Sequence, residues 1–435
     1  MDSYAQMLAQ LRRAPATERF ARLYGHREGE LARQLTRYSR LVKAHEDLFH
    51  ANQAPLYLVS APGRTEIAGN HTDHNNGRVL AAAVNLDCVA CVSPRTDDKV
   101  FVQSQGFPAI ELTLADLAPR KDEEGTSAAL VRGVAAGMAE RGFKIGGFDA
   151  AITSDVLSGS GLSSSAAYEV LMCAIFDALY NGFTVNSTLR AQIAQYAENV
   201  YFGKPSGLMD QMASSTGGLV TIDFKGEPQV TPLSFGFNEA GYSLVVVNTG
   251  SSHDNLTAEY ASIREEMQAV AQALGEKVLR QVRPEQVWQQ INPLREKLGE
   301  RAVLRAFHFF EENERVKQQV HAIRMNDLGA MFESVKASGE SSWMLLQNVY
   351  PGGSVHQSLA LALAMAASML KDKGAWRVHG GGFAGTTLNF VPNEMVDAFV
   401  QRMEKMFGAH SCFVLDVRPE GAAIVFGPED KAWEK

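Results

Sequence analysis

The Gly/Ser-rich segment VLSGSGLSSS at residues 156–165 most constrains this chain, because it leads directly into an apolar helical pattern. Gly159 and Gly161 permit positive φ angles and a close approach of the backbone to a ligand. After the loop, small and aliphatic residues recur at helical spacing as far as Leu179, which predicts a buried helix. Because the free N–H groups at the start of such a helix favour anions, we predict a phosphate-binding loop.

The predicted phosphate cradle is a run of glycines, hydroxyl side chains and backbone N–H groups. It comprises Gly159, Ser160, Gly161, Leu162, Ser163, Ser164 and Ser165. A lone loop of this kind is equally well interpreted as a flexible turn before a capped core helix. Two further motifs favour the phosphate site: APGRTEIAGNHTDHNNG at residues 61–77 and HGGGFAGTTLNF at residues 379–390.

Length and charge limit the class of protein. A chain of 435 residues predicts two domains, and a formal charge of −8 argues against binding to nucleic acid. The longest apolar run, residues 358–370, is too short to span a bilayer, and the first residues lack the apolar core of a signal peptide. We therefore expect a cytoplasmic protein with no membrane partner. Cys88 and Cys91 lie in an apolar, β-rich run, which favours buried packing over a zinc site.

The periodicity divides the chain into three parts. Residues 1–50 read as amphipathic helices that pack on the main body, and residues 51–225 mix strands and helices around the first motif and the loop. Residues 226–435 alternate strands with a helix-rich section, which indicates an α+β domain with a mostly antiparallel sheet. A G-x-G-x-x-G string occurs at Gly380, but the strand pattern after it excludes a Rossmann unit.

The three motifs, which follow one another along the chain at residues 61–77, 156–165 and 379–390, resemble those of the small-molecule kinases that include galactokinase, homoserine kinase, mevalonate kinase and phosphomevalonate kinase. Residues 61–77 resemble the galactokinase signature G-R-x-x-x-x-G-E-H-T-D-Y-x-x-G, and KPSGLMDQMASSTGG at residues 204–218 resembles the segment with the catalytic aspartate. The resemblance implies an N-terminal α/β domain of the ribosomal-protein-S5 type and a C-terminal ferredoxin-like domain. The active site would lie in the cleft between these two domains.

Phosphoryl transfer needs a phosphate cradle, a divalent cation, a positive group on the migrating phosphoryl and a carboxylate near the acceptor hydroxyl. By resemblance, Asp210 is the catalytic carboxylate, in a loop after residues 204–207, and Arg64 lies beside it. Alternatively, Asp210 is a helix N-cap and Arg64 a structural ion-pair partner. The resemblance also implies that ATP is used with Mg²⁺, and that Ser165 and Glu198 hold the metal.

Sugar recognition is assigned by resemblance to five residues: Asn70, His71, Asp73, Gly207 and Tyr260. Two positions depart from the signature, since Asn70 replaces its glutamate and His74 its tyrosine. An amide carries no charge, so the loss of the glutamate makes an acidic sugar more tolerable.

The sequence thus predicts a galactokinase-type sugar 1-kinase that converts D-galactose to α-D-galactose 1-phosphate. The main alternative is a galacturonate 1-kinase. A sensor without catalysis is disfavoured by the intact Asp210, Arg64 and Ser-rich loop. A kinase of the mevalonate or homoserine type is disfavoured because the His and Asp of residues 69–77 have the spacing of the sugar signature.

Overall fold

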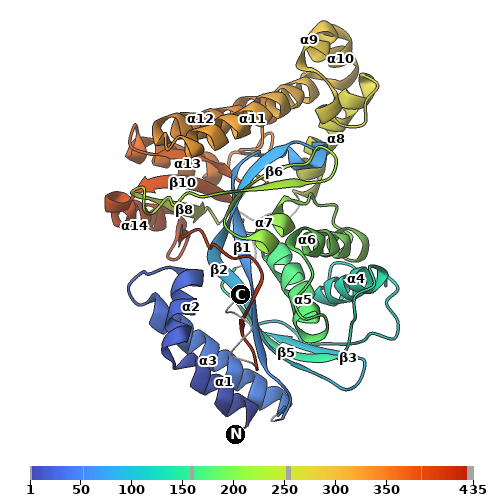
Figure 1. Ribbon diagram of the computed structural model, residues 1–435. Coiled ribbons are helices and arrows are strands. Elements are labelled where there is room, and N and C mark those ends of the chain that lie inside the picture. The colour runs from blue at the N-terminus through green and yellow to red at the C-terminus, as the bar shows by residue number, and fades with distance from the viewer. Residues whose placement is uncertain (1, 52, 157–160, 251–255, 384, 429–435) are drawn as a thin grey trace.

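The computed structural model describes residues 2–51, 53–156, 161–250, 256–383 and 385–428 (Figure 1). The larger of two sheets in these residues has the order β12-β1-β2-β5-β3-β4, and β6 pairs with both β2 and β7. All its pairs are antiparallel except β3 with β5. Its strands are β1 (Tyr57–Ala68), β2 (Arg78–Pro94), β3 (Lys99–Ser104), β4 (Ile110–Thr113), β5 (Phe148–Ser154), β6 (Leu219–Asp223), β7 (Gln229–Leu233) and β12 (Ala423–Phe426).

Helices cover both faces of the larger sheet, because its long central strands are apolar on both sides. On β2, Ala90 and Val92 pack towards the helix after the loop, whereas Val89 and Cys91 pack against the N-terminal helices. Figure 1 shows the two groups of helices on opposite sides. One group is α1 (Ser3–Leu11), α2 (Ala14–Tyr24) and α3 (Glu30–Phe49), and the other is α4 (Ser127–Glu140), α5 (Ser164–Tyr180), α6 (Ser187–Tyr196) and α7 (Met209–Thr216).

The smaller sheet is antiparallel throughout and has the order β11-β8-β10-β9. Its strands are β8 (Tyr242–Asn248), β9 (Ala375–His379), β10 (Thr386–Pro392) and β11 (Cys412–Leu415). The helices of this part are α8 (Thr257–Ala273), α9 (Pro284–Gln289), α10 (Ile291–Leu298), α11 (Glu300–Arg324), α12 (Leu328–Ser341), α13 (Ser358–Leu370) and α14 (Val396–Phe407). Short helical segments are η1 (Asp73–Asn75), η2 (Ala197–Phe202), η3 (Leu279–Gln281), η4 (Ser342–Leu346) and η5 (Asn393–Met395).

The two sheets share one hydrophobic core. Val246 and Phe390 of the smaller sheet belong to the same buried cluster as Val170 of α5. The domain limits at residues 50 and 225 stay a prediction, and the larger sheet also contains β7 and β12, which lie beyond residue 225 in sequence. None of the helices described is long and apolar enough to cross a membrane.

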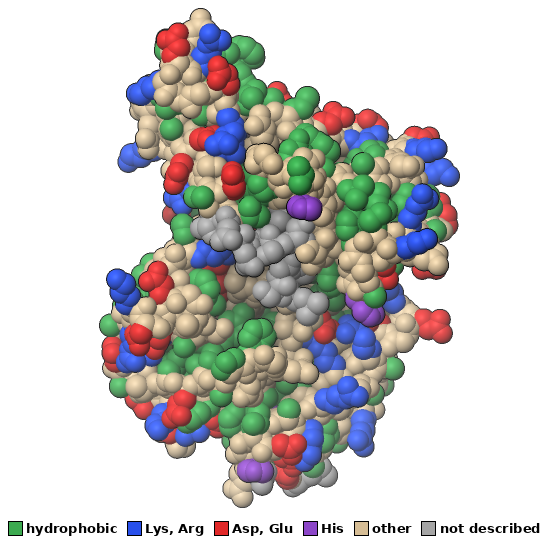
Figure 2. All heavy atoms as spheres, turned by 180° about the vertical axis from the view of Figure 1, so that it is seen from behind, with side chains coloured by type: hydrophobic (Ala, Val, Ile, Leu, Met, Phe, Trp, Pro, Cys, Tyr) green, Lys and Arg blue, Asp and Glu red, His purple; other side chains and the backbone are tan. Residues whose placement is uncertain are grey.

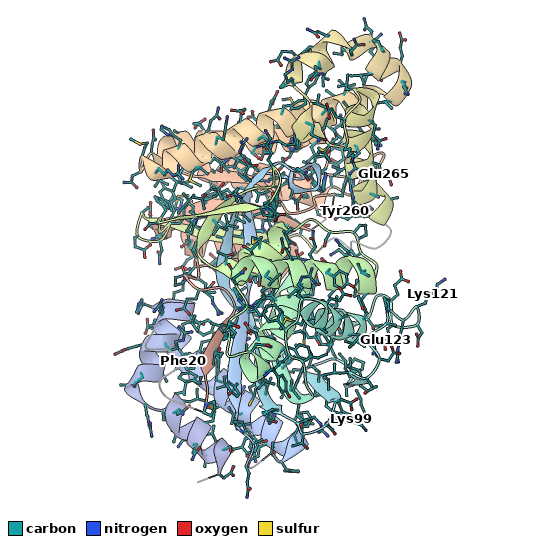
Figure 3. The ribbon with its side chains drawn as sticks, turned by 45° about the vertical axis from the view of Figure 1, so that its right-hand side comes forward. Phe20, Lys99, Lys121, Glu123, Tyr260 and Glu265 are labelled. Carbon is teal, nitrogen blue, oxygen red and sulfur yellow. The ribbon has the colours of Figure 1, made fainter. Side chains whose placement is uncertain are left out.

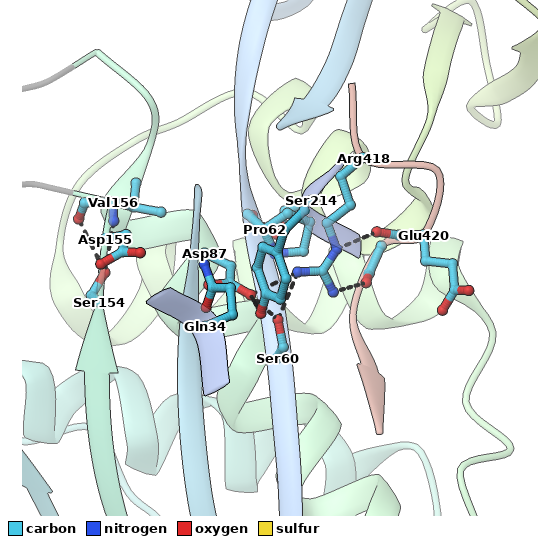
Figure 4. A network of polar contacts seen from close by, with 12 residues as sticks. Gln34, Ser60, Pro62, Asp87, Ser154, Asp155, Val156, Ser214, Arg418 and Glu420 are labelled. Carbon is cyan, nitrogen blue, oxygen red and sulfur yellow. Dashed lines mark hydrogen bonds and ion pairs between the residues drawn. The ribbon is translucent and has the colours of Figure 1, made fainter. Parts of the chain in front are cut away.

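A buried ion cluster fastens the N-terminal helices to the larger sheet (Figure 4). Asp87 on β2 has no exposed surface and accepts hydrogen bonds from Arg37 of α3 at 2.7 Å and from Arg418 at 2.8 Å. Burial alone would raise the pKa of Asp87, but the two arginines lower it below its usual value. Because breaking such a pair would leave a charge buried, the cluster holds α3, β2 and the C-terminal segment in one arrangement.

Two observations concern the sequence expectations for the core and surface. Cys88 and Cys91 are buried and unlinked on β2, which confirms the predicted packing role. On the face shown in Figure 2, acidic and basic side chains of the described residues are interspersed rather than gathered by sign.

Candidate active site

The first motif forms most of β1 and brings Arg64 to Asp210. The Arg64 guanidinium donates from Nε to Asp210 Oδ1 at 2.6 Å and from Nη2 to Oδ2 at 2.7 Å. The expected loop position of Asp210 is wrong, because Asp210 lies in the first turn of α7 and Leu208 occupies the N-cap position. An acidic side chain is stabilised there by the unpaired N–H groups at the helix start.

The Arg64 and Asp210 pair also joins the end of the loop. Ser163 Oγ donates to Asp210 Oδ2, and Arg64 Nη1 donates to the carbonyl oxygen of Gly161 at 2.7 Å. Burial alone would raise the pKa of Asp210, but Arg64 and Ser163 hold it below its usual value. Asp210 is therefore a carboxylate at neutral pH, and β1, α7 and the loop meet at one charged centre.

The described part of the predicted cradle packs closely against the third motif. Gly161 has φ +74°, and a Cβ there would lie 2.3 Å from Thr386 Oγ1 of β10. Ser163 occupies the N-cap position of α5, and Leu162 is buried in the core. Gly159 and Ser160 lie outside the described residues. The loop thus ends at a helix start that faces Arg64, as a phosphate site requires.

The two expected metal ligands lie together where η2, which carries Glu198, meets the first turn of α5, which carries Ser165. Ser165 Oγ is 3.2 Å from Glu198 Oε1, close to the spacing of about 3 Å between neighbouring ligands of an octahedral Mg²⁺ with bonds of about 2.1 Å. Glu198 is 2% exposed and also accepts from Lys204 Nζ at 2.9 Å. Nearby, Glu169 has a buried Oε1 without a partner, and burial and then Glu198 raise its pKa well above the usual value. The buried carboxylates of Glu198 and Glu169 and the hydroxyl of Ser165 are hard oxygen ligands, and such a group of ligands suits a divalent cation.

Asp73 and Gly207 are in direct contact. A Cβ on Gly207 would lie 1.7 Å from Asp73 Oδ2, so the glycine is required for this approach. Burial, together with the charges of Asp210 and Glu66, raises the pKa of Asp73 to about 6. A cavity of about 250 Å³ adjoins the pair, and its lining includes Asp73, His74, Gln195, Gly207, Phe224 and Arg264.

His71 and Tyr260 meet the glycines of the third motif. His71 Nε2 donates to the carbonyl oxygen of Gly381 at 3.0 Å. Tyr260, labelled on α8 in Figure 3, donates to the carbonyl oxygen of Gly382 at 2.9 Å, and a Cβ on Gly381 would lie 2.4 Å from its ring. His71 and Tyr260, both predicted to bind the sugar, therefore hold the glycine segment of the third motif in place at this side of the site.

Asn70 is fully buried, and its amide is engaged by protein groups. Its Nδ2 donates to Glu66 Oε1 at 3.0 Å and to the carbonyl oxygen of Gly380 at 2.7 Å, and its Oδ1 accepts from Asn348 at 2.9 Å. The structure thus places Asn70 beside the residues predicted to bind the sugar, but both the nitrogen and the oxygen of its amide are hydrogen-bonded to protein groups.

Sequence reasoning missed Glu66 and His379. Glu66 lies two residues after Arg64 on β1, and that spacing was the available signal, since alternate residues of a strand share a face. His379 Nε2 accepts from the backbone N–H of Glu66, which requires its proton on Nδ1, towards Thr386 Oγ1. Burial lowers the pKa of His379 well below its usual value, so it is a neutral contact between the first and third motifs.

Two family models match regions that carry most of the predicted site residues, though neither reaches Tyr260 or His379. The model described as the galactokinase galactose-binding signature matches residues 43–94, and the model for the N-terminal domain of GHMP kinases matches residues 129–218. A galactokinase from Glaesserella parasuis is 33% identical over 389 residues, which are 86% of this chain and 97% of that protein. A galactokinase from Streptomyces coelicolor is 34% identical over 362 residues, 82% of this chain and 89% of its own.

Solved structures show the same fold. The structure of Lactococcus lactis galactokinase complexed with galactose superposes with a TM-score of 0.78 at 24% identity and covers 89% of this chain and 99% of that chain. A mevalonate kinase superposes with a TM-score of 0.59 at 13% identity and covers 82% and 98%. These likenesses confirm the two-domain kinase fold that the motifs predict.

Proposed function

Since this chain belongs to the galactokinase family, we propose that it transfers the γ-phosphoryl group of ATP to the anomeric hydroxyl of D-galactose. The product is α-D-galactose 1-phosphate. The observation that supports this proposal most strongly is the pairing of Arg64 with both oxygens of Asp210, next to Ser163 at the start of α5. That arrangement sets a carboxylate, a cation and a helix N-terminus side by side, which are the groups that phosphoryl transfer uses.

In this proposal Asp210 orients the anomeric hydroxyl and accepts its proton as the phosphoryl group is transferred. Its lowered pKa makes it a weak base, which suffices because a loose transition state needs little removal of the proton beforehand. Arg64 holds the carboxylate in one orientation and adds positive charge beside the transferred group. Asp73 accepts hydrogen bonds from sugar hydroxyls. Because Gly207 has no side chain, the Asp73 carboxylate can lie directly against it.

We further propose that Ser165 and Glu198 hold Mg²⁺ together with the nucleotide. When bound, the cation neutralises charge on the phosphate oxygens. Lys204 and Gln211 keep the Glu198 carboxylate in place, because each donates to one of its oxygens, at 2.9 and 2.8 Å. The loop from Gly159 to Ser165 forms the phosphate cradle, with its N–H groups and hydroxyls as donors.

A panel of acceptors tests the proposed substrate. ATP consumption is measured with galactose, galacturonate, glucuronate, N-acetylgalactosamine and mevalonate at equal concentrations. The proposal expects galactose to give the highest kcat/KM, with no turnover of mevalonate. A preference for mevalonate or for a uronic acid would contradict it, and nucleotide binding without turnover of any acceptor would favour a sensor.

A further inference from the structure

Glu66 and Asn70 form a hydrogen-bonded pair, and Asn70 stands where the family signature has its glutamate. We propose that Glu66 supplies the carboxylate that the signature has at position 70, and that Asn70 positions it, so that the site selects a neutral hexose over a uronic acid. This inference rests on the proposed sugar kinase activity and names the residue that decides between its two candidate substrates.

The direction of Glu66 follows from the strand. From Arg64 to Glu66, β1 pairs with β2 in regular register, Arg64 opposite Ala83 and Glu66 opposite Ala81. Side chains two residues apart on a strand point to the same face, and Arg64 points to Asp210. Glu66 therefore lies on the face of the sheet that carries the catalytic pair.

The contacts of Glu66 fix its carboxylate. Its Oε1 accepts from Asn70 Nδ2 at 3.0 Å and from Arg377 Nη2 at 2.6 Å. Asn70 in turn binds the carbonyl oxygen of Gly380 and the amide of Asn348, so both ends of its amide are occupied. An amide with these partners cannot also form a hydrogen bond with a sugar hydroxyl, but it holds the carboxylate of Glu66 in one position.

The charge of Glu66 reaches the residues that are assigned to the sugar. Asp73 has a raised pKa because of its burial and because of the charges of Asp210 and Glu66, and Glu66 also helps to raise the pKa of Arg64. Replacement of the signature glutamate by Asn70 therefore does not remove the acid from this corner of the site. A uronate carboxylate placed against Glu66 would meet a like charge that Arg377 offsets in part, whereas a hydroxymethyl group could donate a hydrogen bond.

The pair makes a sharp prediction for substitutions. Asn70→Glu alone would place a second carboxylate against Glu66, where the amide now donates a hydrogen bond. Glu66→Asn together with Asn70→Glu keeps one acid and one amide and places the acid at position 70, where the signature has it. If the two residues act as a unit, the double variant must be far more active than the product of the two single effects allows.

The experiment measures kcat/KM for galactose and galacturonate in wild type, Glu66→Gln, Glu66→Asn, Asn70→Glu and the double variant. We expect Glu66→Gln and Asn70→Glu each to lower kcat/KM for galactose at least about tenfold, and Glu66→Gln to raise the galacturonate-to-galactose ratio at least about tenfold. The double variant is expected within about threefold of wild type. Glu420→Gln, at an acid that pairs with both Arg19 and Arg22 of α2, controls for loss of an ion pair away from the site.

Glu66→Gln has the shape of the native side chain but leaves the buried Arg377 guanidinium without its carboxylate partner, so its thermal midpoint is expected to fall. Its KM for ATP should match wild type, which would show that the folded variant keeps its nucleotide site. An unchanged substrate ratio in Glu66→Gln, or a double variant no better than the product of the single effects, would overturn the inference. Failure of the proposed function has a different signature: wild type would not phosphorylate galactose. If wild type prefers galacturonate, both the proposed galactose kinase activity and the selection against uronic acids by Glu66 are wrong.

Discussion

Gly207 lies so close to Asp73 that a Cβ atom at position 207 would come within 1.7 Å of Oδ2. Gly207 lies in the segment before α7, and Asp73 begins η1, so this contact sets the distance between α7, which carries Asp210, and the first motif. A single methyl group cannot be accommodated unless one of these two elements moves.

Gly207→Ala is therefore expected to raise the KM for galactose at least about tenfold, with a smaller change in the KM for ATP. Steady-state kinetics with each substrate varied in turn measure the split. Gly352→Ala is the matched control, because a Cβ there meets nothing within 4 Å. Equal losses for both substrates would show that Gly207 supports the fold rather than the sugar site.

The pH dependence of galactose use should report Asp73. Its pKa is raised to about 6 by burial and neighbouring acids, so the carboxylate is lost by protonation as the pH falls through 6. A protonated Asp73 no longer accepts from two hydroxyls, and kcat/KM for galactose is expected to fall about tenfold per pH unit below that value. The residual activity of Asp73→Asn should not show this fall in kcat/KM below pH 6. The same fall in the variant would mean that another group titrates there.

Ser165→Ala should raise the Mg²⁺ concentration needed for half-maximal activity by about fivefold or more, because the metal loses one oxygen ligand. Activity is titrated with MgCl₂ at fixed ATP, and galactose binding is measured separately by calorimetry. Ser358→Ala, in the first turn of α13, serves as the control. If the Mg²⁺ titrations of wild type and Ser165→Ala superimpose, Ser165 is not a metal ligand and serves only at the start of α5.

The N-terminal helices should make stability depend on pH. His45 on α3 binds Tyr4 and the carbonyl oxygen of Asp149, and burial lowers its pKa from 6.5 to about 4. Between these values the unfolded chain binds a proton that the native protein does not, so the free energy of unfolding falls with falling pH, by up to about 1.4 kcal/mol per unit.

Denaturant unfolding at pH 7, 6, 5 and 4 measures this slope. His45→Gln should be less stable than wild type at pH 7 but should lose less stability on acidification. His71 and His308, whose pKa values burial also lowers to about 4, keep part of the slope in both proteins. Parallel curves for wild type and variant would exclude His45 as a contributor.

The elements could be predicted from the sequence because local patterns encode them, and the apolar spacing after the loop gives α5. The association of Arg64 with Asp210 follows from the resemblance of their two motifs to the galactokinase family, and the structure places the two side chains in contact. The position of Asp210 on α7 was missed because the Lys204–Gly207 segment is irregular and the helix after it has only eight residues.

The partners of Asn70 could not be predicted, since they come from segments far away in sequence. Gly380 and Asn348 lie about 300 residues along the chain and reach Asn70 only when the two sheets share one core. The return of β12 to the larger sheet is likewise a long-range pairing, with β1, that no local pattern specifies.

Product formation by Asp210→Asn shows whether Asp210 serves the transfer of phosphate to C1 of galactose. Asp223→Asn is the matched control, because Asp223 has a similarly exposed side chain (28% against 32%) and also pairs with arginines, Arg78 and Arg280. Proton-detected NMR of galactose with ATP and Mg²⁺ follows the anomeric proton coupled to phosphorus. We expect α-galactose 1-phosphate from wild type and Asp223→Asn, and a rate at least about a hundredfold lower from Asp210→Asn. Near-normal formation of this product by Asp210→Asn, or phosphorylation of another hydroxyl by wild type, would contradict it.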